Sequence, residues 1–221
     1  MAGASHGKFG NDRLTLYTDR YNHCCMSDGG PSNTDNRNHI LERALDLFAR
    51  RGYDAVGVQE IAVAAQVTKP TLYHYFESKH GLLTAIVAVH GSPLRSAVRQ
   101  AALYQQDLVM NLERVAFALV EQAKAQPVFY RLLLALYFAP PECEARAVAM
   151  DLLLDLQQCL EELFSAAVPQ HGNMRGRQGA YAATYLGMLN TWIGIYLNDL
   201  SALDPPAIRA ALKQYQHGIF S

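Results

Sequence analysis

One stretch of the sequence, TKPTLYHYFESK at residues 68–79, concentrates hydroxyl groups, aromatic rings and two lysines. Side chains of these types can line a catalytic pocket, or they can lie against a polyanion such as a nucleic acid, where cations and hydroxyls bind phosphate oxygens. The remainder of the sequence decides between these two kinds of site.

The rest of the sequence contains no motif that supports a catalytic pocket. It contains no GxSxG, HExxH, phosphate-binding-loop or dinucleotide-binding motif, and its eight histidines are scattered without metal-ligand spacing. The four cysteines form no CxxC pair, and we interpret them as reduced thiols: Cys24, Cys25, Cys143 and Cys159. We therefore expect no catalytic residue, no metal and no cofactor, and we predict that the protein is not an enzyme.

Composition limits the remaining possibilities. Half of the 221 residues are apolar, which suffices for a packed core, and the formal net charge is −1. Because the charge is nearly balanced, contact with a nucleic acid must come from a local patch. The sequence has no apolar run long enough to span a bilayer and no signal peptide, so we expect a cytoplasmic protein without a membrane partner.

Residues 37–83 are predicted to form short helices that share one core. The first helix ends at Gly52, and the second begins near Gly57. Thr68 caps the third, whose buried pair is Leu72 and Phe76. The inward face of the first helix carries Ile40, Leu41, Ala44, Leu47 and Phe48.

A tight turn between the second and third helices makes a helix-turn-helix motif, whose second helix enters the major groove of DNA. Residues 37–83 resemble the N-terminal domain of the TetR family of bacterial transcriptional repressors. The resemblance rests on many positions in fixed register: Arg37, Ile40, Leu41, Ala44, Leu47, Phe48, Gly52, Tyr53, Ile61, Ala62, Ala65, Val67, Leu72, Tyr73, Phe76, Ser78, Lys79 and Leu82.

The resemblance implies a homodimer with two DNA-binding heads and a larger C-terminal domain for ligand binding and dimerisation. Lys79 and Arg37 would each meet a phosphate, and the third helix would face the bases. The residues implied to contact double-stranded DNA are Arg37, Thr68, Lys69, Thr71, Tyr73, His74 and Lys79. For Tyr73 and Tyr75 the alternative is packing within the head, and for Lys79 it is simple solvation.

Several positions depart from the family pattern. Val56 and Gly57 replace a common pair of hydroxyl residues, and Gln59 stands where arginine is frequent, so groups that bind phosphate are missing. Gln66 replaces a glycine that is common in the turn, which implies strain of about 1 kcal/mol if its backbone is left-handed. A helical protein–protein interaction module with a degenerated DNA-binding head is therefore the alternative function.

The pattern stays helical to the end, so we predict an all-α protein. Ser78 caps a fourth helix, which the Gly-Ser-Pro at residues 91–93 should kink or break. Further helices are expected over residues 106–126, 128–138, 141–167, 175–199 and 205–219. We divide the chain into a disordered extension at residues 1–36, a helix-turn-helix domain at 37–83, and a helical ligand-binding and dimerisation domain at 84–221.

The last two predicted helices carry the expected dimer surface. Ala180, Ala183, Gly187 and Gly194 form a stripe of small residues that permits close helix approach, and in the family two such helices from each subunit make a four-helix bundle. The interface residues are predicted to be Leu186, Leu189, Ile193, Leu197, Ile208, Leu212, Tyr215 and Ile219. The alternative is an ordinary intramolecular core.

Aromatic side chains of the C-terminal domain are candidates for the pocket of a small, mainly apolar inducer. The candidates are Phe117, Tyr137, Tyr181, Tyr185 and Trp192, for each of which core packing is the alternative. The predicted function is that of a DNA-binding transcriptional regulator, a repressor that such a ligand releases from its operator. The ligand would move the fourth helix and so change the spacing of the two heads.

Overall fold

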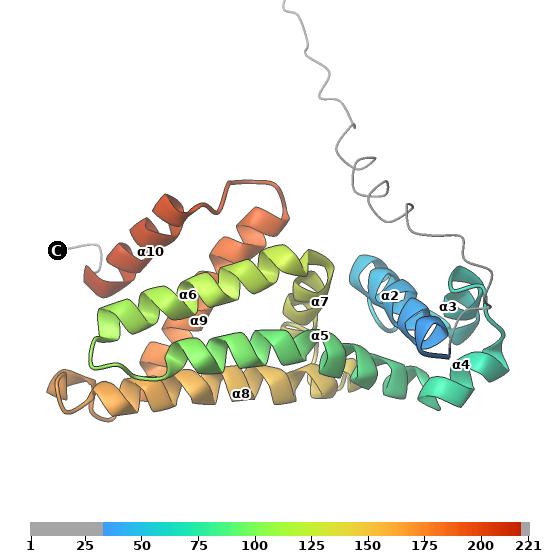
Figure 1. The fold of residues 1–221 in the computed structure, drawn as a ribbon, viewed down its shortest axis with the longest axis horizontal. Coiled ribbons are helices and arrows are strands. Elements are labelled where there is room, and N and C mark those ends of the chain that lie inside the picture. Colours follow the sequence, from blue (N-terminus) through green and yellow to red (C-terminus); the bar gives the residue numbers. More distant parts are fainter. Residues whose placement is uncertain (1–32, 218–221) are drawn as a thin grey trace, which may run out of the picture.

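The computed structural model describes residues 33–217, and in that range it contains helices and no strand (Figure 1). The helices are α2 (Asn33–Arg51), α3 (Val58–Ala64), α4 (Lys69–Phe76), α5 (Lys79–Ala102), α6 (Leu108–Ala125), α7 (Pro127–Tyr137), α8 (Glu144–Ala167), the short 3₁₀ helix η1 (Gly172–Met174), α9 (Gln178–Leu197) and α10 (Pro205–His217). The predicted all-α fold is confirmed, and the helices lie close to their expected ranges.

Helices α2, α3 and α4 form a small unit at one end of the molecule, which we call the head (Figure 1). Its core is made by side chains that are at most 4% exposed: Ile40, Leu41, Ala44, Leu45, Phe48, Val56, Ile61, Ala62, Ala65, Leu72 and Phe76. The two predicted caps are present, since Thr68 Oγ1 accepts a hydrogen bond from Thr71 N–H at 3.3 Å and Ser78 Oγ accepts one from Gly81 N–H at 2.9 Å. Local capping therefore fixes where α4 and α5 begin.

The first described helix begins earlier than expected. The predicted disordered extension includes residues 33–36, but these residues form the first turn of α2. Asp35 in that turn is favoured by the positive end of the helix dipole, which helps to extend the helix beyond its apolar stripe. The rest of the predicted extension, residues 1–32, lies outside the described residues.

A kink or a break was predicted at residues 91–93, and the break is wrong, because helix α5 is continuous from Lys79 to Ala102. A proline inside a helix costs about 3 kcal/mol, but burial of one large apolar side chain contributes about 1.5–3 kcal/mol. After Pro93 the helix still buries Leu94 and Val98, and α5 packs along both α6 and α8. Packing of this face outweighs the local preference for a break.

Helices α5 to α10 form the larger unit, which we call the body. Figure 1 shows α5 and α8 running side by side along its length, with α6 on the other side of α5 and with α9 and α10 near the end away from the head. Helices α5 and α8 pack closely at Gly91, because a Cβ atom there would lie 2.8 Å from Leu152 Cδ2. The head is thus joined to the body through a helix that is packed over most of its length.

The predicted dimer residues on α9 and α10 face inward instead. Five of them are between 0% and 8% exposed: Leu189, Ile193, Leu197, Ile208 and Leu212. Tyr215 is partly buried, and its hydroxyl donates a hydrogen bond to the backbone oxygen of Tyr181 at 2.9 Å. Leu186 is also partly buried, and Ile219 lies outside the described residues. The assignment of the five buried residues to an intermolecular surface is wrong, because within the subunit α9 packs against α6, α7 and α8, and α10 packs against α6.

Candidate functional site

The turn between α3 and α4 sets the position of α4. Its backbone is held by hydrogen bonds from Gln66 N–H to Val63 O at 3.1 Å and from Val67 N–H to Ala62 O at 2.9 Å. Gln66 has a φ of 54°, so the left-handed backbone considered in the sequence analysis is present at a residue other than glycine. The turn is therefore well bonded but locally strained.

Helix α4 presents its polar residues to solvent. Leu72 is fully buried and Phe76 is 4% exposed, which turns the opposite face of the helix outward. The side chains of Lys69, Tyr73 and His74 are exposed on α4, with Tyr73 at 43%. A compact row of a cation, a phenol and an imidazole on one short helix is a surface that can contact a polyanion.

Hydroxyl groups extend this surface at the start of α4. Thr68 is exposed and Thr71 is partly buried, and their Oγ1 atoms are 2.8 Å apart. Tyr75 is also partly buried and its ring lies 5.5 Å from that of His74, so it belongs to the packing of the head as much as to its surface.

Two cations of the head rest on aromatic rings. The guanidinium carbon of Arg37 lies 5.3 Å from the ring centroid of Phe76, and Lys79 Nζ lies 4.1 Å from that of Tyr53. Such contacts restrict where a flexible cation can point. Both cations were predicted from the sequence, but their aromatic partners were not, because the paired residues are far apart in the chain and have no shared spacing.

Other features of the head reduce its positive charge. Arg50 Nε lies 2.8 Å from Asp46 Oδ1, and Arg51 forms an ion pair with Glu60. Val56 is 1% exposed and belongs to the core, which explains why a residue without a hydroxyl is accepted there. The head therefore relies on few cations for any contact with an anion.

The head touches the start of α8. Burial, followed by the nearby Glu144 and Asp54 carboxylates, raises the pKa of Tyr53 to about 12, so its hydroxyl stays protonated. Cys143 Sγ lies 3.8 Å from Asp54 Oδ2, and His80 Nε2 lies 4.0 Å from Glu144 Oε1. The Tyr53 side chain, whose ring contacts Lys79, thus also interacts with the Glu144 carboxylate of α8.

The aromatic residues expected to form a ligand pocket line neither of the two grooves described below. The Phe117 ring stacks with the Arg209 guanidinium at 5.4 Å, and Tyr137 is 44% exposed next to Phe138. Tyr185 is fully buried, and its hydroxyl donates to the backbone oxygen of Leu112. Tyr181 packs 5.7 Å from Phe164, and Trp192 is a partly buried residue on α9. The aromatic cavity therefore stays a prediction, since composition alone does not show which rings converge.

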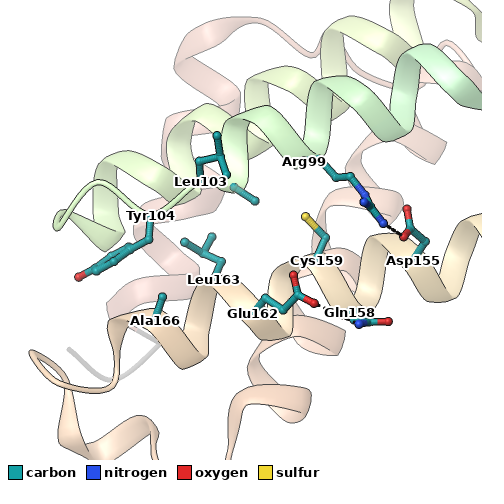
Figure 2. A pocket seen from close by; sticks show the side chains of 10 residues that line it. Arg99, Leu103, Tyr104, Asp155, Gln158, Cys159, Glu162, Leu163 and Ala166 are labelled. Carbon is teal, nitrogen blue, oxygen red and sulfur yellow. Dashed lines mark hydrogen bonds and ion pairs between the residues drawn. The ribbon is translucent and has the colours of Figure 1, made fainter.

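Two grooves lie along the seam between α5 and α8. The one farther from the head has a volume of about 310 Å³ and is lined by Arg99, Ala102, Leu103, Tyr104, Asp155, Gln158, Cys159, Glu162, Leu163 and Ala166 (Figure 2). Burial, followed by Glu162, raises the pKa of the Cys159 thiol. This thiol stays protonated and is a poor nucleophile.

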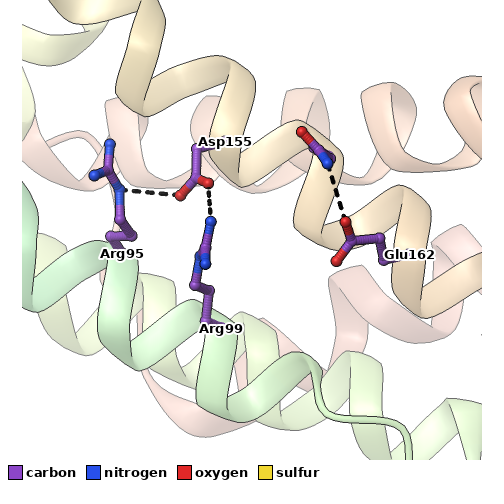
Figure 3. Close-up of polar contacts among 5 residues, drawn as sticks. Arg95, Arg99, Asp155 and Glu162 are labelled. Atoms are coloured by element: carbon purple, nitrogen blue, oxygen red, sulfur yellow. Dashed lines mark hydrogen bonds and ion pairs between the residues drawn. The ribbon is translucent and has the colours of Figure 1, made fainter.

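The groove nearer the head is larger, at about 660 Å³. Its lining combines small apolar side chains with a polar rim: His80, Thr84, Val87, Ala88, Gly91, Ser92, Arg95, Ala147, Val148, Asp151 and Leu152. Between the two grooves, Arg95 Nε lies 3.0 Å from Asp155 Oδ2 and Arg99 pairs with the other oxygen of Asp155 (Figure 3). One carboxylate on α8 therefore ties together two successive turns of α5.

Neither a metal site nor a membrane span is found in the part of the chain that the structure describes. Residues 33–217 contain no group of three His, Cys, Asp or Glu side chains placed to hold a metal ion. Within the same range no helix combines the length and apolar character needed to cross a bilayer.

Comparison with known proteins agrees with the helix-turn-helix geometry. Residues 40–86 match the family described as bacterial regulatory proteins, tetR family. The chain is 32% identical over 131 residues to the HTH-type transcriptional activator FasR of Mycolicibacterium smegmatis, a match that covers 59% of this chain and 58% of that protein. It is 32% identical over 92 residues to the HTH-type transcriptional repressor DhaR of Mycobacterium sp. strain GP1, covering 42% of this chain and 37% of that one. The matched part is thus less than two thirds of the length of either relative.

A solved structure extends the similarity into the body. The TetR family transcriptional regulator PfmR from Thermus thermophilus superimposes with a TM-score of 0.65 and 26% identity, over 82% of this chain and 99% of that chain. These proteins are transcriptional regulators and not enzymes, in agreement with the class predicted from the sequence.

The strained turn gives a prediction about stability. Replacing Gln66 by glycine should raise the free energy of unfolding by roughly 0.5–1 kcal/mol, because relief of the left-handed strain outweighs the greater chain entropy of glycine. Gln59→Gly is the matched control: Gln59 is an exposed helical residue, and glycine there should lower the free energy of unfolding by about 1 kcal/mol. Urea unfolding of both variants tests this, and equal destabilisation by the two would show that Gln66 is not strained.

Proposed function

The chain belongs to the TetR family of bacterial regulatory proteins, and we propose that it is a transcriptional repressor that binds a double-stranded DNA operator as a homodimer. The observation that supports this most is the outward face of α4, where Lys69, Tyr73 and His74 are exposed on a helix anchored by Leu72 and Phe76. In a helix-turn-helix, this is the helix whose N-terminal part meets base edges in the major groove.

The proposed contacts to DNA are of two kinds, to bases and to phosphates. Lys69, Thr71 and Tyr73 can reach bases from α4, whereas the ring-supported Arg37 and Lys79 are suited to phosphate oxygens. Base contacts would carry the sequence preference, and phosphate contacts would fix the register. With so few cations, we expect modest affinity that depends strongly on each of them.

The dimer is proposed to form through the exposed face of α9. Ala180, Ala183 and Gly187 are exposed, and no atom of the described part of the subunit lies within 4 Å of a Cβ built on Gly187. Small residues allow two helices to approach closely, so this stripe suits a partner helix, whereas the larger residues beside it serve the subunit core. To read successive major grooves, the two heads of this dimer would have to lie about 34–36 Å apart.

A ligand is proposed to act at the seam between α5 and α8. The groove of about 660 Å³ offers Val87, Ala88 and Val148 to an apolar group and Asp151 or Arg95 to a polar end. Because α5 is continuous from the head through this groove, a molecule wedged between the two helices would shift the head as well. This location replaces the scattered aromatic residues as the proposed site for a small, mainly apolar inducer.

An alternative function as a protein–protein interaction module stays open for one reason. Val56 is buried and Gln59 is neutral, so two groups that would help to bind phosphate are missing from the head.

Regulation could also be positive, since the relatives include an activator and a repressor. Expression of the adjacent gene should rise when this protein is deleted, if it represses.

DNA binding is tested with two variants in α4. A double-stranded fragment from beside the encoding gene should bind the protein, with affinity that falls steeply as salt increases. Lys69→Ala and Tyr73→Ala should each weaken binding by about 1–3 kcal/mol without changing the melting temperature, because both side chains are exposed. Lys213→Ala, which removes an exposed lysine of α10 in the body, is the control. Two α4 variants that bind like the wild type would exclude this face, and a fragment that never binds would favour the interaction module.

The dimer interface is tested by placing a charge on the small-residue stripe. Gly187→Glu should yield a folded monomer. The glycine has open space around its Cβ position, and glutamate favours a helix over glycine by nearly 1 kcal/mol. Sedimentation should show the monomer, and binding to an operator with two half-sites should fall. Ser96→Glu adds the same charge to an exposed position of α5 and should leave the dimer intact. A dimer that survives Gly187→Glu would place the interface elsewhere.

The ligand site is tested by filling the groove. Apolar compounds that raise the melting temperature should also release DNA. To weaken DNA affinity a hundredfold, a compound must bind the DNA-incompetent state more tightly than the DNA-competent state by about 2.7 kcal/mol. Ala147→Trp, at an exposed position in the groove wall, should abolish the thermal shift, whereas Ala135→Trp on α7 should not. A compound that stabilises the fold and leaves DNA affinity unchanged would contradict the proposed coupling.

A further inference from the structure

Helix α7 lies between the head and helix α9 (Figure 1), and it packs against both α2 and α9. Five of its eleven residues are at most 4% exposed: Phe129, Tyr130, Leu132, Leu133 and Leu136. A helix that is enclosed in this way cannot shift without moving its neighbours. It is therefore a second connection between the head and the body, beside α5.

A buried hydrogen bond joins α7 to α9. Tyr130 is 3% exposed, and its hydroxyl donates to Asn190 Oδ1 at 2.7 Å. Burial raises the pKa of Tyr130 above its usual value, so the hydroxyl stays protonated and remains a donor. Apolar contacts have no direction and would allow two helices to slide, whereas a hydrogen bond of this length requires one relative position. The bond therefore fixes the position of α9 along α7.

The next residue of α7 holds the end of α9. Arg131 lies at the surface, and its guanidinium donates to Asn198 Oδ1 at 3.1 Å and to the backbone oxygen of Leu197. The Asn198 amide donates in turn to the backbone oxygen of Gly194 at 2.8 Å. The last carbonyl groups of a helix lack partners within it, and the helix dipole favours a cation there. Since Asn190 and Asn198 are about two turns apart, α7 holds α9 at two points about 12 Å apart.

We propose that Tyr130 and Arg131 are positioning residues that set the distance between the two heads of the dimer, with Tyr130 as the main contributor. In the proposed dimer the face of α9 that carries Ala183 and Gly187 pairs with a second copy. The position of α9 against α7 then determines where α2, and with it the head, lies relative to the two-fold axis. This role rests on the proposed function, whereas the hydrogen bonds do not depend on it.

The two partners of the buried bond can be removed separately or together. Tyr130→Phe leaves the Asn190 amide oxygen without its donor, and Asn190→Leu leaves a phenol hydroxyl without its acceptor. The double variant removes both polar groups, which costs less stability than leaving one of them unpaired. It does not restore the directional contact. Stability and head spacing should therefore separate in the double variant.

The first experiment measures urea unfolding at one fixed protein concentration. Each single variant should lower the equilibrium constant for folding by at least about fivefold, and the double variant should lie closer to the wild type than either. Tyr185→Phe is the matched control, because this buried tyrosine of α9 donates instead to the backbone oxygen of Leu112 on α6. Losses that simply add in the double variant would show that the bond does not couple the two residues, and would overturn the proposal.

The second experiment measures affinity for the operator fragment and for versions whose centre is one base pair longer or shorter, a change of about 3.4 Å. The wild type should lose affinity when the spacing changes. In Tyr130→Phe and in the double variant this loss should be about two- to fivefold smaller, because the heads are less firmly placed. Arg131→Gln should act in the same direction, and Arg131→Lys, which keeps a cation at the end of α9, should act less.

Two outcomes of the spacing experiment would overturn the positioning role. One is a double variant that recovers stability and also keeps the spacing preference of the wild type. The other is a Tyr185→Phe variant that tolerates altered spacing as well as Tyr130→Phe does, since the effect would then belong to α9 as a whole and not to its bond with α7.

The third experiment measures the separation of the heads without DNA. A spin label in place of Arg43, an exposed residue of α2, reports the distance between the two heads of the dimer. The distribution of this distance should widen in Tyr130→Phe and in the double variant and should stay narrow in Tyr185→Phe. An unchanged distribution in Tyr130→Phe would overturn the proposal.

Failure of the proposed function gives a different result. Absence of DNA binding in every variant would contradict that function, and the label distances would still decide whether Tyr130 positions the head. A wild-type monomer in sedimentation would contradict the proposed dimer and would overturn the positioning role with it.

Discussion

The apolar stripe of α5 is the feature on which the rest of the structure depends. It begins near the head with Leu82 and Leu83, passes Gly91 where α5 packs closely against Leu152 of α8, and continues through Leu94 and Val98 between α6 and α8. Each buried side chain contributes about 1.5–3 kcal/mol, which is enough to carry the helix past an internal proline. The head and the body are therefore connected by one helix that continues through residues 91–93.

The polar contacts between head and body are arranged around this helix. His90 reaches α2 and the α6–α7 corner from one side of α5, and His80 approaches the start of α8 from another. The pair of arginines on Asp155 fixes the far part of α5 to α8 (Figure 3). A change in the α5–α8 seam must consequently strain either these bonds or the position of the head. This geometry is how a groove in the body can influence a surface in the head.

Local signals predicted the head better than the body. The caps at Thr68 and Ser78 and the buried pair on α4 depend on neighbours a few residues away, and the sequence contains those neighbours. In the body, the periodic leucines of α9 and α10 revealed that one face is buried but not whether the same subunit or a partner buries it. The five aromatic candidates line neither groove, and their convergence in space depends on tertiary packing that no local spacing encodes.

The nearly neutral head raises the question of how few cations can suffice on DNA. Arg37 and Lys79 are already held over Phe76 and Tyr53, so binding a phosphate would immobilise them at a smaller cost in side-chain entropy than for free cations. Phe76 also belongs to the core of the head, and Tyr53 lies next to Glu144 of α8. The proposed phosphate contacts thus depend on the packing of the head and on its contact with the body. A change in the packing of the head or in its contact with the body would move Arg37 and Lys79, the two cations proposed to bind operator phosphates.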